Sequence, residues 1–355
     1  MEIVLMLAGG LATLIGGAQL LVRGAGRLAL GFGISPLVVG LTVVAFGTSS
    51  PELAVSVQSA WSGQVDLALG NVVGSNIFNV LLILGASALL APLVVSLQVI
   101  RQEVPIMIAA SLWLLGVTLD GGLSRGEGLL FVAGLAAYTT FLVVQSRRTM
   151  PAPETGNGPP STGWDAKLPG QLLLVGAGLV LLVAGSNWLV EAAVSLARQF
   201  GISELVIGLT IIAAGTSLPE VATSLLATLR GERDIAVGNV VGSCIFNLLG
   251  VLGVSALAAP VSLPVAPSLA AFDMPVMIAV AIACLPVFFT GRTIARWEGG
   301  VFLGYYLAYT SYLILDAREH DLLTTYTVAM RWVVMPLTIL TLAVVLNREL
   351  KARRR

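Results

Sequence analysis

Charged residues are scarce in this chain of 355 residues: 11% are Asp, Glu, Lys or Arg, while 57% are hydrophobic. A soluble globular domain carries about 25% charged residues, so this composition excludes a soluble protein. The single histidine, His320, lies in a polar stretch, which argues against a histidine-based metal site or catalytic triad. The two cysteines, Cys244 and Cys284, lie in apolar runs and are predicted to be buried free thiols. Composition alone therefore predicts a polytopic all-α membrane protein.

Runs of about 20 apolar residues, the length that a helix needs to cross the hydrocarbon core, occur eleven times. The first is preceded by Glu2 instead of a basic region and stays apolar for longer than a signal core, so we interpret it as a span and not as a cleaved signal peptide. The stretch 146–169 is rich in Pro, Gly and Ser and predicts a flexible cytoplasmic linker. The predicted spans are about 3–22, 36–60, 68–91, 104–119, 127–145, 170–190, 204–229, 235–259, 274–290, 298–315 and 326–346.

The distribution of Lys and Arg predicts the orientation of the chain. With the amino terminus outside, alternate loops place fifteen of these residues inside and four outside, as the positive-inside rule favours. The basic tail then lies in the cytoplasm, where a topology anchor is favoured over a specific lipid or nucleic-acid site. We expect a multi-pass protein of the inner (plasma) membrane with no nucleic-acid partner and no obligate protein partner.

One segment of the chain is duplicated. Residues 33–80 align with residues 201–248 at a fixed offset of 168, without a gap, and 28 of the 48 positions are identical. The two copies begin at the second and the seventh predicted spans, and an odd separation inverts the second copy relative to the first. Inverted repeats with a site near the midplane are typical of secondary transporters. We expect a first five-helix repeat (1–145), a second, inverted one (170–315), and an extra transmembrane helix with a basic tail (316–355).

Each copy carries a carboxylate in the middle of an apolar span, Glu52 in Gly-Thr-Ser-Ser-Pro-Glu and Glu220 in Gly-Thr-Ser-Leu-Pro-Glu. An unpaired charge at the bilayer centre costs roughly 3 kcal/mol, so such a residue indicates a functional site. Pro51 and Pro219 have no N–H to donate to the carbonyl four residues earlier, which predicts a kink with loosened carbonyls. Thr48 shares a helix face with Glu52.

The following span of each copy contributes a second motif, Gly-Asn-Val-Val-Gly-Ser-x-Ile-Phe-Asn. Ser75 and Asn79 are four residues apart, as are Ser243 and Asn247, and the hairpin returns Asn79 to about the depth of Glu52. Taken singly, each Glu could be satisfied within a kinked helix, and each Asn could hydrogen bond between helices. Recurrence of the whole set on inverted copies favours one shared site.

The predicted site offers oxygen ligands only, since none of its proposed ligand residues is a histidine or a cysteine. Such ligands with two carboxylates suit Ca²⁺ or Na⁺ and do not suit Zn²⁺ or Cu⁺. An empty site would hold two charges in a low dielectric, so crossing the membrane unloaded is disfavoured. This asymmetry predicts an obligate exchanger.

The paired motifs resemble those of the sodium/calcium exchangers of the calcium/cation antiporter superfamily, specifically the compact prokaryotic type. The resemblance covers the first ten spans and implies a ten-helix antiporter core, without enzymatic activity or cofactor, in which Na⁺ entry drives Ca²⁺ out. It implies that Glu52 and Glu220 bind Ca²⁺ together with backbone oxygens of Thr48 and Thr216. It further implies that Na⁺ is served mainly by Ala45, Ser49, Ser75, Ala213, Ser217 and Ser243, with Asn79 and Asn247 completing the centre.

The sequence departs from this family in three respects. Some relatives, including potassium-dependent ones, carry Asp at the position of Asn247, so K⁺ co-transport is not expected. The linker is too short for a calcium-sensing domain, and the last helix is extra. The alternative is a proton/calcium antiporter of the same superfamily, although those relatives typically carry Gly-Asn-x-x-Glu. An intramembrane aspartyl protease would need paired Asp residues within spans, and the predicted spans contain none.

Overall fold

The computed structural model describes residues 2–149, 167–199, 213–317 and 320–353. These residues contain eight helices long and apolar enough to cross a membrane, or nine if the bent pair Pro36–Thr48 and Ser50–Trp61 forms one span. Each of the eleven predicted spans contains a helix, although residues 204–212 of the seventh lie outside the described residues. The prediction of an all-α polytopic membrane protein is therefore confirmed, while the number of spans in each repeat stays a prediction.

The first half of the chain is built from helices that are repeatedly interrupted by short π-helical segments (η). Its elements are α1 (Glu2–Phe32), α2 (Pro36–Val39), η1 (Gly40–Val44), α3 (Ala45–Thr48), α4 (Ser50–Trp61), α5 (Val65–Phe78), η2 (Asn79–Leu84), α6 (Gly85–Leu90), β1 (Leu93–Val94), η3 (Val99–Glu103), α7 (Val104–Val117), the 3₁₀ turn η4 (Thr118–Asp120), β2 (Gly122–Leu123) and α8 (Arg125–Thr149).

Where it is described, the second half repeats this order except for the 3₁₀ turn, and it adds a final helix. Its elements are α9 (Leu168–Gln199), α11 (Ala213–Thr216), α12 (Leu218–Leu229), α13 (Arg233–Phe246), η7 (Asn247–Val251), α14 (Leu252–Ala258), β3 (Leu263–Pro264), η8 (Leu269–Asp273), α15 (Met274–Phe289), β4 (Thr293–Ile294), α16 (Arg296–Ala317), α17 (Leu322–Ala329), η9 (Met330–Val334) and α18 (Met335–Arg353).

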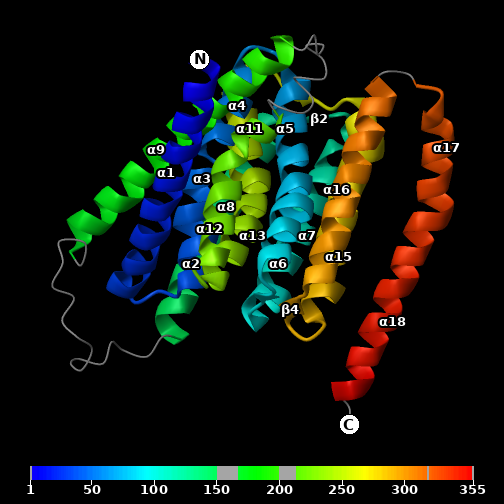
Figure 1. The fold of residues 1–355 in the computed structure, drawn as a ribbon. Coiled ribbons are helices and arrows are strands. Elements are labelled where there is room, and N and C mark those ends of the chain that lie inside the picture. Colours follow the sequence, from blue (N-terminus) through cyan, green and yellow to red (C-terminus); the bar gives the residue numbers. More distant parts are fainter. Residues whose placement is uncertain (1, 150–166, 200–212, 318–319, 354–355) are drawn as a thin grey trace.

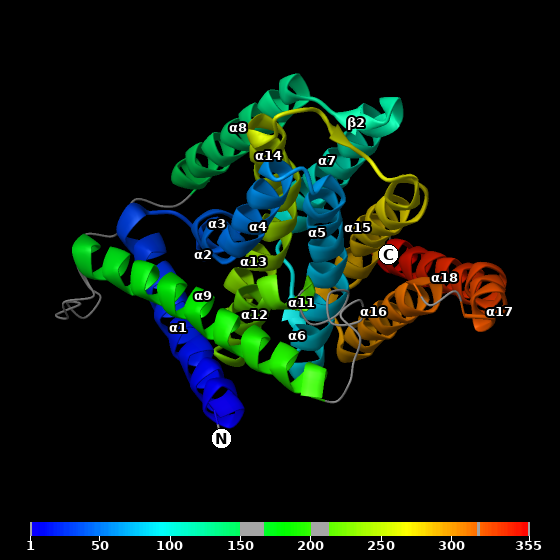
Figure 2. The ribbon, with the colours of Figure 1, turned by 90° about the horizontal axis from the view of Figure 1, so that it is seen from above.

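Helices α1 and α9 pack against each other on one side of the molecule (Figure 2). A Cβ on Gly17 would lie 2.7 Å from the backbone nitrogen of Leu182, and a Cβ on Gly178 would lie 2.7 Å from that of Leu21. Glycine is required here because the two backbones touch. Gly10, earlier in α1, instead meets the later part of α9 around Gly185. The two helices thus run antiparallel, so the second copy is inverted relative to the first.

The connections of the two halves also contact each other through two short β-ladders. Strand β1 pairs with β4 and strand β2 pairs with β3, each antiparallel, so two connections of the first half hydrogen bond to two of the second. Helices α5 and α13 lie at the centre of the bundle (Figure 2), and the spans that contain them are the most buried of the long apolar helices. A Cβ on Gly242 of α13 would lie 2.7 Å from the backbone of Leu41, so the two segments are in direct contact. The two copies of the duplicated segment therefore meet at the middle of the protein.

The last helix, α17 to α18, stands at the edge of the bundle (Figure 1). From Leu322 to Val345 none of its side chains is buried by the rest of the protein. It contacts α15 and α16, where the Tyr305 hydroxyl hydrogen bonds to Thr338. Its start in Figure 1 lies at the same end of the bundle as the start of α1, and its end lies at the opposite end, as an odd number of spans requires.

The structure corrects several predicted boundaries. Helix α8 continues to Thr149 and α9 begins at Leu168, so the predicted linker is shortened at both ends, and its residues 150–166 lie outside the described residues. Segments η3 and η8 begin about five residues before the predicted fourth and ninth spans, which brings Glu103 and Asp273 into helices. Cys244 and Cys284 are both buried and free, as predicted.

Candidate cation site

The span that carries Glu52 is broken within its first motif. The axes of Pro36–Thr48 and Ser50–Trp61 differ by 47°, and the break falls at Ser49, with φ −82° and ψ 9°. Ser217 has nearly the same dihedral angles, φ −90° and ψ 7°, in the second copy. Pro51 and Pro219 explain both breaks, since each removes the N–H that would continue the helical hydrogen bonds. The predicted kink is confirmed in the first copy, and the described residues of the second copy show the same helix break at Ser217.

The two carboxylates exchange their serine partners across the copies. Ser49 Oγ donates a hydrogen bond of 2.8 Å to Glu220 Oε1, and Ser217 Oγ donates one of 2.7 Å to Glu52 Oε1. Both glutamates are buried, with exposed fractions of 1% for Glu52 and 0% for Glu220. Within the described part of the chain, the second carboxylate oxygen of each makes no hydrogen bond. Two unsatisfied anionic oxygens at this depth are the acceptors that a cation would satisfy.

The backbone and the threonines complete the surroundings of the carboxylates. Each glutamate carboxylate lies near its own N–H, in the first turn of α4 or α12, where N–H groups have no intrahelical acceptor. The Thr216 side chain contacts Glu52, and the Thr48 side chain contacts Glu220. The amino-terminal end of a helix dipole also favours a negative charge. These groups partly offset the cost of burying the two carboxylates.

The predicted asparagines lie where the following helices change their winding. Asn79 opens η2 and Asn247 opens η7, and π-helical turns are frequent at functional sites. Both side chains are buried, and within the described residues neither amide atom of Asn79 and only the nitrogen of Asn247 makes a hydrogen bond. Ser217 Oγ lies 3.4 Å from Ser75 Oγ, and the Ser243 side chain lies beside Glu220. The structure therefore brings both motifs together.

The two alanines among the predicted site residues could offer a cation only their backbone oxygens. The carbonyl of Ala45 accepts a hydrogen bond of 3.0 Å from the N–H of Ser49 and a longer one of 3.4 Å from the Thr48 hydroxyl. Ala213 opens α11, next to Thr216 in the same short helix. The residues that precede it and its side chain lie outside the described part of the structure.

Two further asparagines, Asn71 and Asn239, lie beside the site, and the sequence did not single them out. The hydroxyl of Thr48 lies 3.1 Å from Asn239 Oδ1, and Asn239 Nδ2 donates 2.9 Å to Ser224 Oγ. In the first copy, Asn71 Nδ2 donates 2.9 Å to Ser56 Oγ. Both asparagines belong to the Gly-Asn that opens the second motif, so the duplication itself carried the signal. Each ties the broken span to the helix that follows it.

The donor set is restricted to oxygen. Among the residues that the structure describes, no group of three or more His, Cys, Asp or Glu is placed to hold a metal. A cation here would bind the carboxylates of Glu52 and Glu220 together with hydroxyl, amide and carbonyl oxygens. Hard cations such as Ca²⁺ take such mixed oxygen shells of six to eight ligands. The residues present thus fit Ca²⁺ or Na⁺ as a transported substrate.

Inverted copies that meet at a buried pair of carboxylates between broken helices define the class of this protein as a secondary transporter of the membrane. The family described as sodium/calcium exchanger protein matches residues 2–144 and 170–315. The chain therefore belongs to the sodium/calcium exchanger protein family, whose members transport ions and are not catalysts, and it is a multi-pass membrane protein.

Relatives and solved structures agree with this assignment. The chain is 42% identical over 289 residues to CaxA of Alkalimonas amylolytica, whose name carries the word antiporter, covering 79% of this chain and 88% of the relative. It is 34% identical over 311 residues to the sodium/calcium exchanger MaX1 of Methanosarcina acetivorans, covering 77% and 87%. A solved structure of the sodium-calcium exchanger NCX_Mj superposes with a TM-score of 0.75 at 29% identity, covering 88% of this chain and 99% of that one.

Proposed function

We propose that this protein exchanges Na⁺ for Ca²⁺ across the membrane by alternating access, independently of K⁺ and without a cofactor. The observation that carries the proposal is the pair of buried carboxylates, each with one oxygen bonded to a serine of the other copy and one oxygen unsatisfied. The unpaired amide atoms of Asn79 and Asn247 add neutral oxygens beside them. The names of MaX1 and NCX_Mj support Na⁺ and Ca²⁺ as the substrates.

The proposed site residues are those that the family resemblance implies, and the geometry of the carboxylates, serines and asparagines supports them. The Ca²⁺ ligands would be Glu52 and Glu220 with backbone oxygens of Thr48 and Thr216. Hydroxyls of Ser49, Ser217, Ser75 and Ser243, backbone oxygens of Ala45 and Ala213, and the amides of Asn79 and Asn247 would complete the shells of Na⁺ and Ca²⁺. These twelve residues are Glu52, Glu220, Thr48, Thr216, Asn79, Asn247, Ser49, Ser217, Ser75, Ser243, Ala45 and Ala213.

The same geometry accounts for obligate exchange. Without a cation, the two carboxylates would be uncompensated negative charges in a low-dielectric interior, where each buried ion costs several kcal/mol. A bound Ca²⁺, or several Na⁺, neutralises them. Movement of the site between the two faces is therefore favoured only when it is loaded, and an outward step with one ion needs a return step with the other.

The proposed orientation places the amino terminus outside the cell and the carboxyl terminus in the cytoplasm. Fifteen of the nineteen Lys and Arg residues then lie on the cytoplasmic side, as the positive-inside rule favours. Residues 1–145 and 170–315 would form the two inverted repeats of the antiporter, and the helix within 316–355 would be additional to them. Protease accessibility of tags at the two termini of right-side-out vesicles tests this orientation.

The experiment that tests the function is uptake of radiolabelled Ca²⁺ into proteoliposomes loaded with Na⁺. The pH is clamped on both sides, and external Na⁺ is replaced by choline in one series and by K⁺ in another. We expect uptake that requires internal Na⁺ and is equal in the two external media. Glu52→Gln and Glu220→Gln should each abolish uptake while inserting normally, and Asp321→Asn, in an exposed loop, is the matched control. Normal flux from both glutamate variants would reject the shared site.

The second candidate is proton/calcium exchange, which the two fully buried carboxylates could also perform by carrying protons in place of Na⁺. The same vesicles distinguish the two. With Na⁺ absent on both sides, an imposed pH gradient would drive Ca²⁺ uptake only in a proton-coupled exchanger. Uptake in that arm, with none under a Na⁺ gradient, would replace Na⁺ by H⁺ in the proposal.

A further inference from the structure

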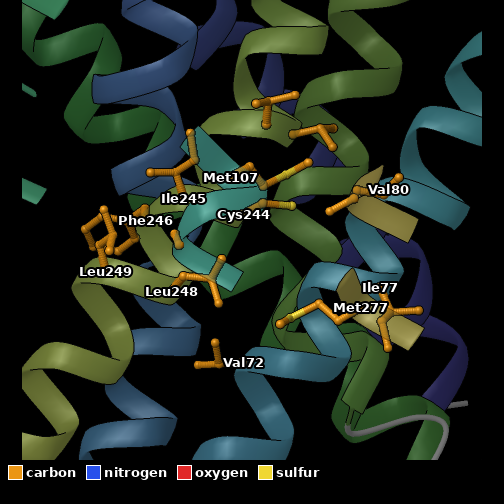
Figure 3. Close-up of a cluster of buried hydrophobic side chains, with 14 of the residues drawn as sticks. Val72, Ile77, Val80, Met107, Cys244, Ile245, Phe246, Leu248, Leu249 and Met277 are labelled. Carbon is orange, nitrogen blue, oxygen red and sulfur yellow. The ribbon is translucent and has the colours of Figure 1, made fainter. Parts of the chain in front are cut away.

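A single position breaks the symmetry of the second motif. The segments 70–79 and 238–247 are identical at nine of ten positions, and the exception is Asn76, whose equivalent is Cys244. Both side chains are buried at the junction of the two copies, with Asn76 3% and Cys244 0% exposed. Cys244 belongs to the apolar cluster that also contains Met107 and Met277 (Figure 3). An amide in such surroundings needs its hydrogen bonds satisfied.

The hydrogen bonds of Asn76 fix the orientation of its amide. Its Nδ2 lies 3.3 Å from the backbone carbonyl of Cys244 and 3.6 Å from the sulfur of Met277. A carbonyl and a thioether can only accept, so the nitrogen must face them and the oxygen must face the other way. That oxygen accepts a hydrogen bond of 3.4 Å from Asn247 Nδ2. Asn76 therefore presents an acceptor, and not a donor, to residue 247.

The amide of Asn247 is oriented in turn. With its nitrogen held by Asn76, its Oδ1 points away from Asn76, and within the described residues this oxygen has no hydrogen-bond partner. Residue 247 must also remain a donor, because a carboxylate at this position would set an anionic oxygen against the Asn76 oxygen. A flip of Asn76 would not relieve this conflict, since it would turn its oxygen toward the Cys244 carbonyl.

The other copy lacks this arrangement. Cys244 is the residue that faces Asn79 there, and a thiol is only a weak hydrogen-bonding group. Apart from this weak contact with the thiol, neither amide atom of Asn79 makes a hydrogen bond within the part of the chain that the structure describes. Asn79 and Asn247 thus occupy equivalent positions in the sequence, but their amides are held differently. The Asn247 amide is oriented by its hydrogen bond to Asn76, whereas the Asn79 amide has no comparable partner.

We propose that Asn76 is a positioning residue that sets the specificity of the site by holding the Asn247 amide with its oxygen toward the cation and by disfavouring a carboxylate at position 247. The net charge of the ligand set is then fixed by Glu52 and Glu220 alone. This inference rests on the proposed function, since it takes the site to bind Ca²⁺. The two copies would then contribute differently to the cation shell. The Asn247 amide oxygen from the second copy is already oriented, whereas the Asn79 amide from the first copy can rotate to suit the ion.

The test is a double-mutant cycle between positions 76 and 247, read by direct binding of radiolabelled Ca²⁺ to purified protein and by the KM for Ca²⁺ in proteoliposomes. Asn76→Cys copies the residue found at the equivalent position, so it suits the packing of the site. We expect it to raise the Kd for Ca²⁺ about five- to tenfold, as the loss of one hydrogen bond implies. The matched control, Cys244→Ser, should change the Kd by less than about twofold, because a hydroxyl keeps a hydrogen-bonding group beside Asn79 and leaves Asn76 holding Asn247.

The decisive comparison is Asn247→Asp in two backgrounds. With Asn76 present, the added carboxylate should weaken Ca²⁺ binding or leave it unchanged, in spite of its charge. In the Asn76→Cys background, the same change should tighten binding at least tenfold relative to Asn76→Cys alone. An equal shift in both backgrounds would overturn the inference, as would equal effects of Asn76→Cys and Cys244→Ser.

The swap variant Asn76→Cys with Cys244→Asn covers the case in which a single variant folds poorly. It moves the amide to the other copy, so the penalty for a carboxylate should move from position 247 to position 79. A penalty that stays at position 247 would overturn the inference. Wild-type protein that neither binds nor transports Ca²⁺ would instead reject the proposed function, whereas Ca²⁺ transport with additive effects would reject the role of Asn76 alone.

Discussion

The hydroxyl of Tyr138 donates a hydrogen bond of 2.6 Å to the carboxylate of Glu103, which is 0% exposed. Gln98 and Gln102 donate to the other oxygen of the same carboxylate. The second half of the chain repeats the contact, since Tyr309 in α16 donates 2.8 Å to Asp273 at the end of η8. Each contact fastens the first turns of a membrane helix to the helix that follows it.

Tyr138→Phe should lower the thermal stability of the protein in detergent. The change leaves a buried carboxylate oxygen without its donor, which costs about 1 to 3 kcal/mol. The loss is measured as a lower melting temperature by size-exclusion chromatography after heating. Tyr309→Phe is the matched control and should cost less, because Asp273 is partly exposed. Equal melting temperatures for wild type and Tyr138→Phe would contradict the prediction.

Ser49→Ala and Ser217→Ala should each weaken Ca²⁺ transport through the same step. Each removes a charge-assisted hydrogen bond to the glutamate of the other copy, which is worth about 1.5 to 3 kcal/mol, or roughly ten- to a hundredfold in an equilibrium constant. We expect a higher KM for Ca²⁺ in both variants. Ser50→Ala serves as control, since Ser50 Oγ donates to the carbonyl of Phe46 and not to a carboxylate. A large effect of one serine and none of the other would show that the reciprocal contacts are not equivalent.

Gly17→Ala should destabilise the protein and reduce its activity, whereas Gly16→Ala should not. A methyl group on Gly17 would meet the α9 backbone at 2.7 Å, while one on Gly16 meets nothing within 4 Å. Overpacking of this kind costs about 1 to 3 kcal/mol, and here the atoms in the way belong to a backbone that cannot rotate aside. Melting temperature and Ca²⁺ uptake are measured for both variants. The idea fails if the two glycines tolerate alanine equally.

Removal of Ca²⁺ should destabilise the wild-type protein more than the glutamate variants. A ligand present at a hundred times its Kd stabilises the folded state by about 2.7 kcal/mol, so EGTA should lower the melting temperature in a Na⁺-free buffer. In Glu52→Gln the site has lost half of its charge, and the shift caused by Ca²⁺ should largely disappear. Mg²⁺, which demands octahedral geometry and dehydrates reluctantly, is expected to give a smaller shift. An unchanged Ca²⁺ shift in Glu52→Gln would place the ion elsewhere.

The position of the two glutamates was predictable because three sequence properties converge on it. The carboxylates interrupt apolar spans, proline follows the same glycine at the same distance, and the duplication repeats both features. The inversion followed from counting spans, since an odd number between copies reverses direction. These properties are local or periodic, so they survive any error of a few residues in the boundaries.

The partners of the glutamates could not be obtained in this way. Which serine faces which carboxylate depends on how the broken helices cross, and that crossing is set by contacts such as Gly242 against Leu41. The role of Asn76 was hidden for the same reason, because its partner Asn247 lies 171 residues away in the other copy. Glu103 was missed because a charge near the end of an apolar run shortens the predicted span, while in the structure the helix begins at Val99 and buries it.

The exchange of serines between the glutamates has a consequence for what one half of the chain could do alone. A single half would carry its carboxylate into the bilayer without the hydroxyl that satisfies it, because that hydroxyl is always supplied by the opposite half. Two identical halves inserted in opposite directions would supply each other. The site is thus a property of an antiparallel pair, and joining the halves in one chain guarantees that every molecule contains one of each direction.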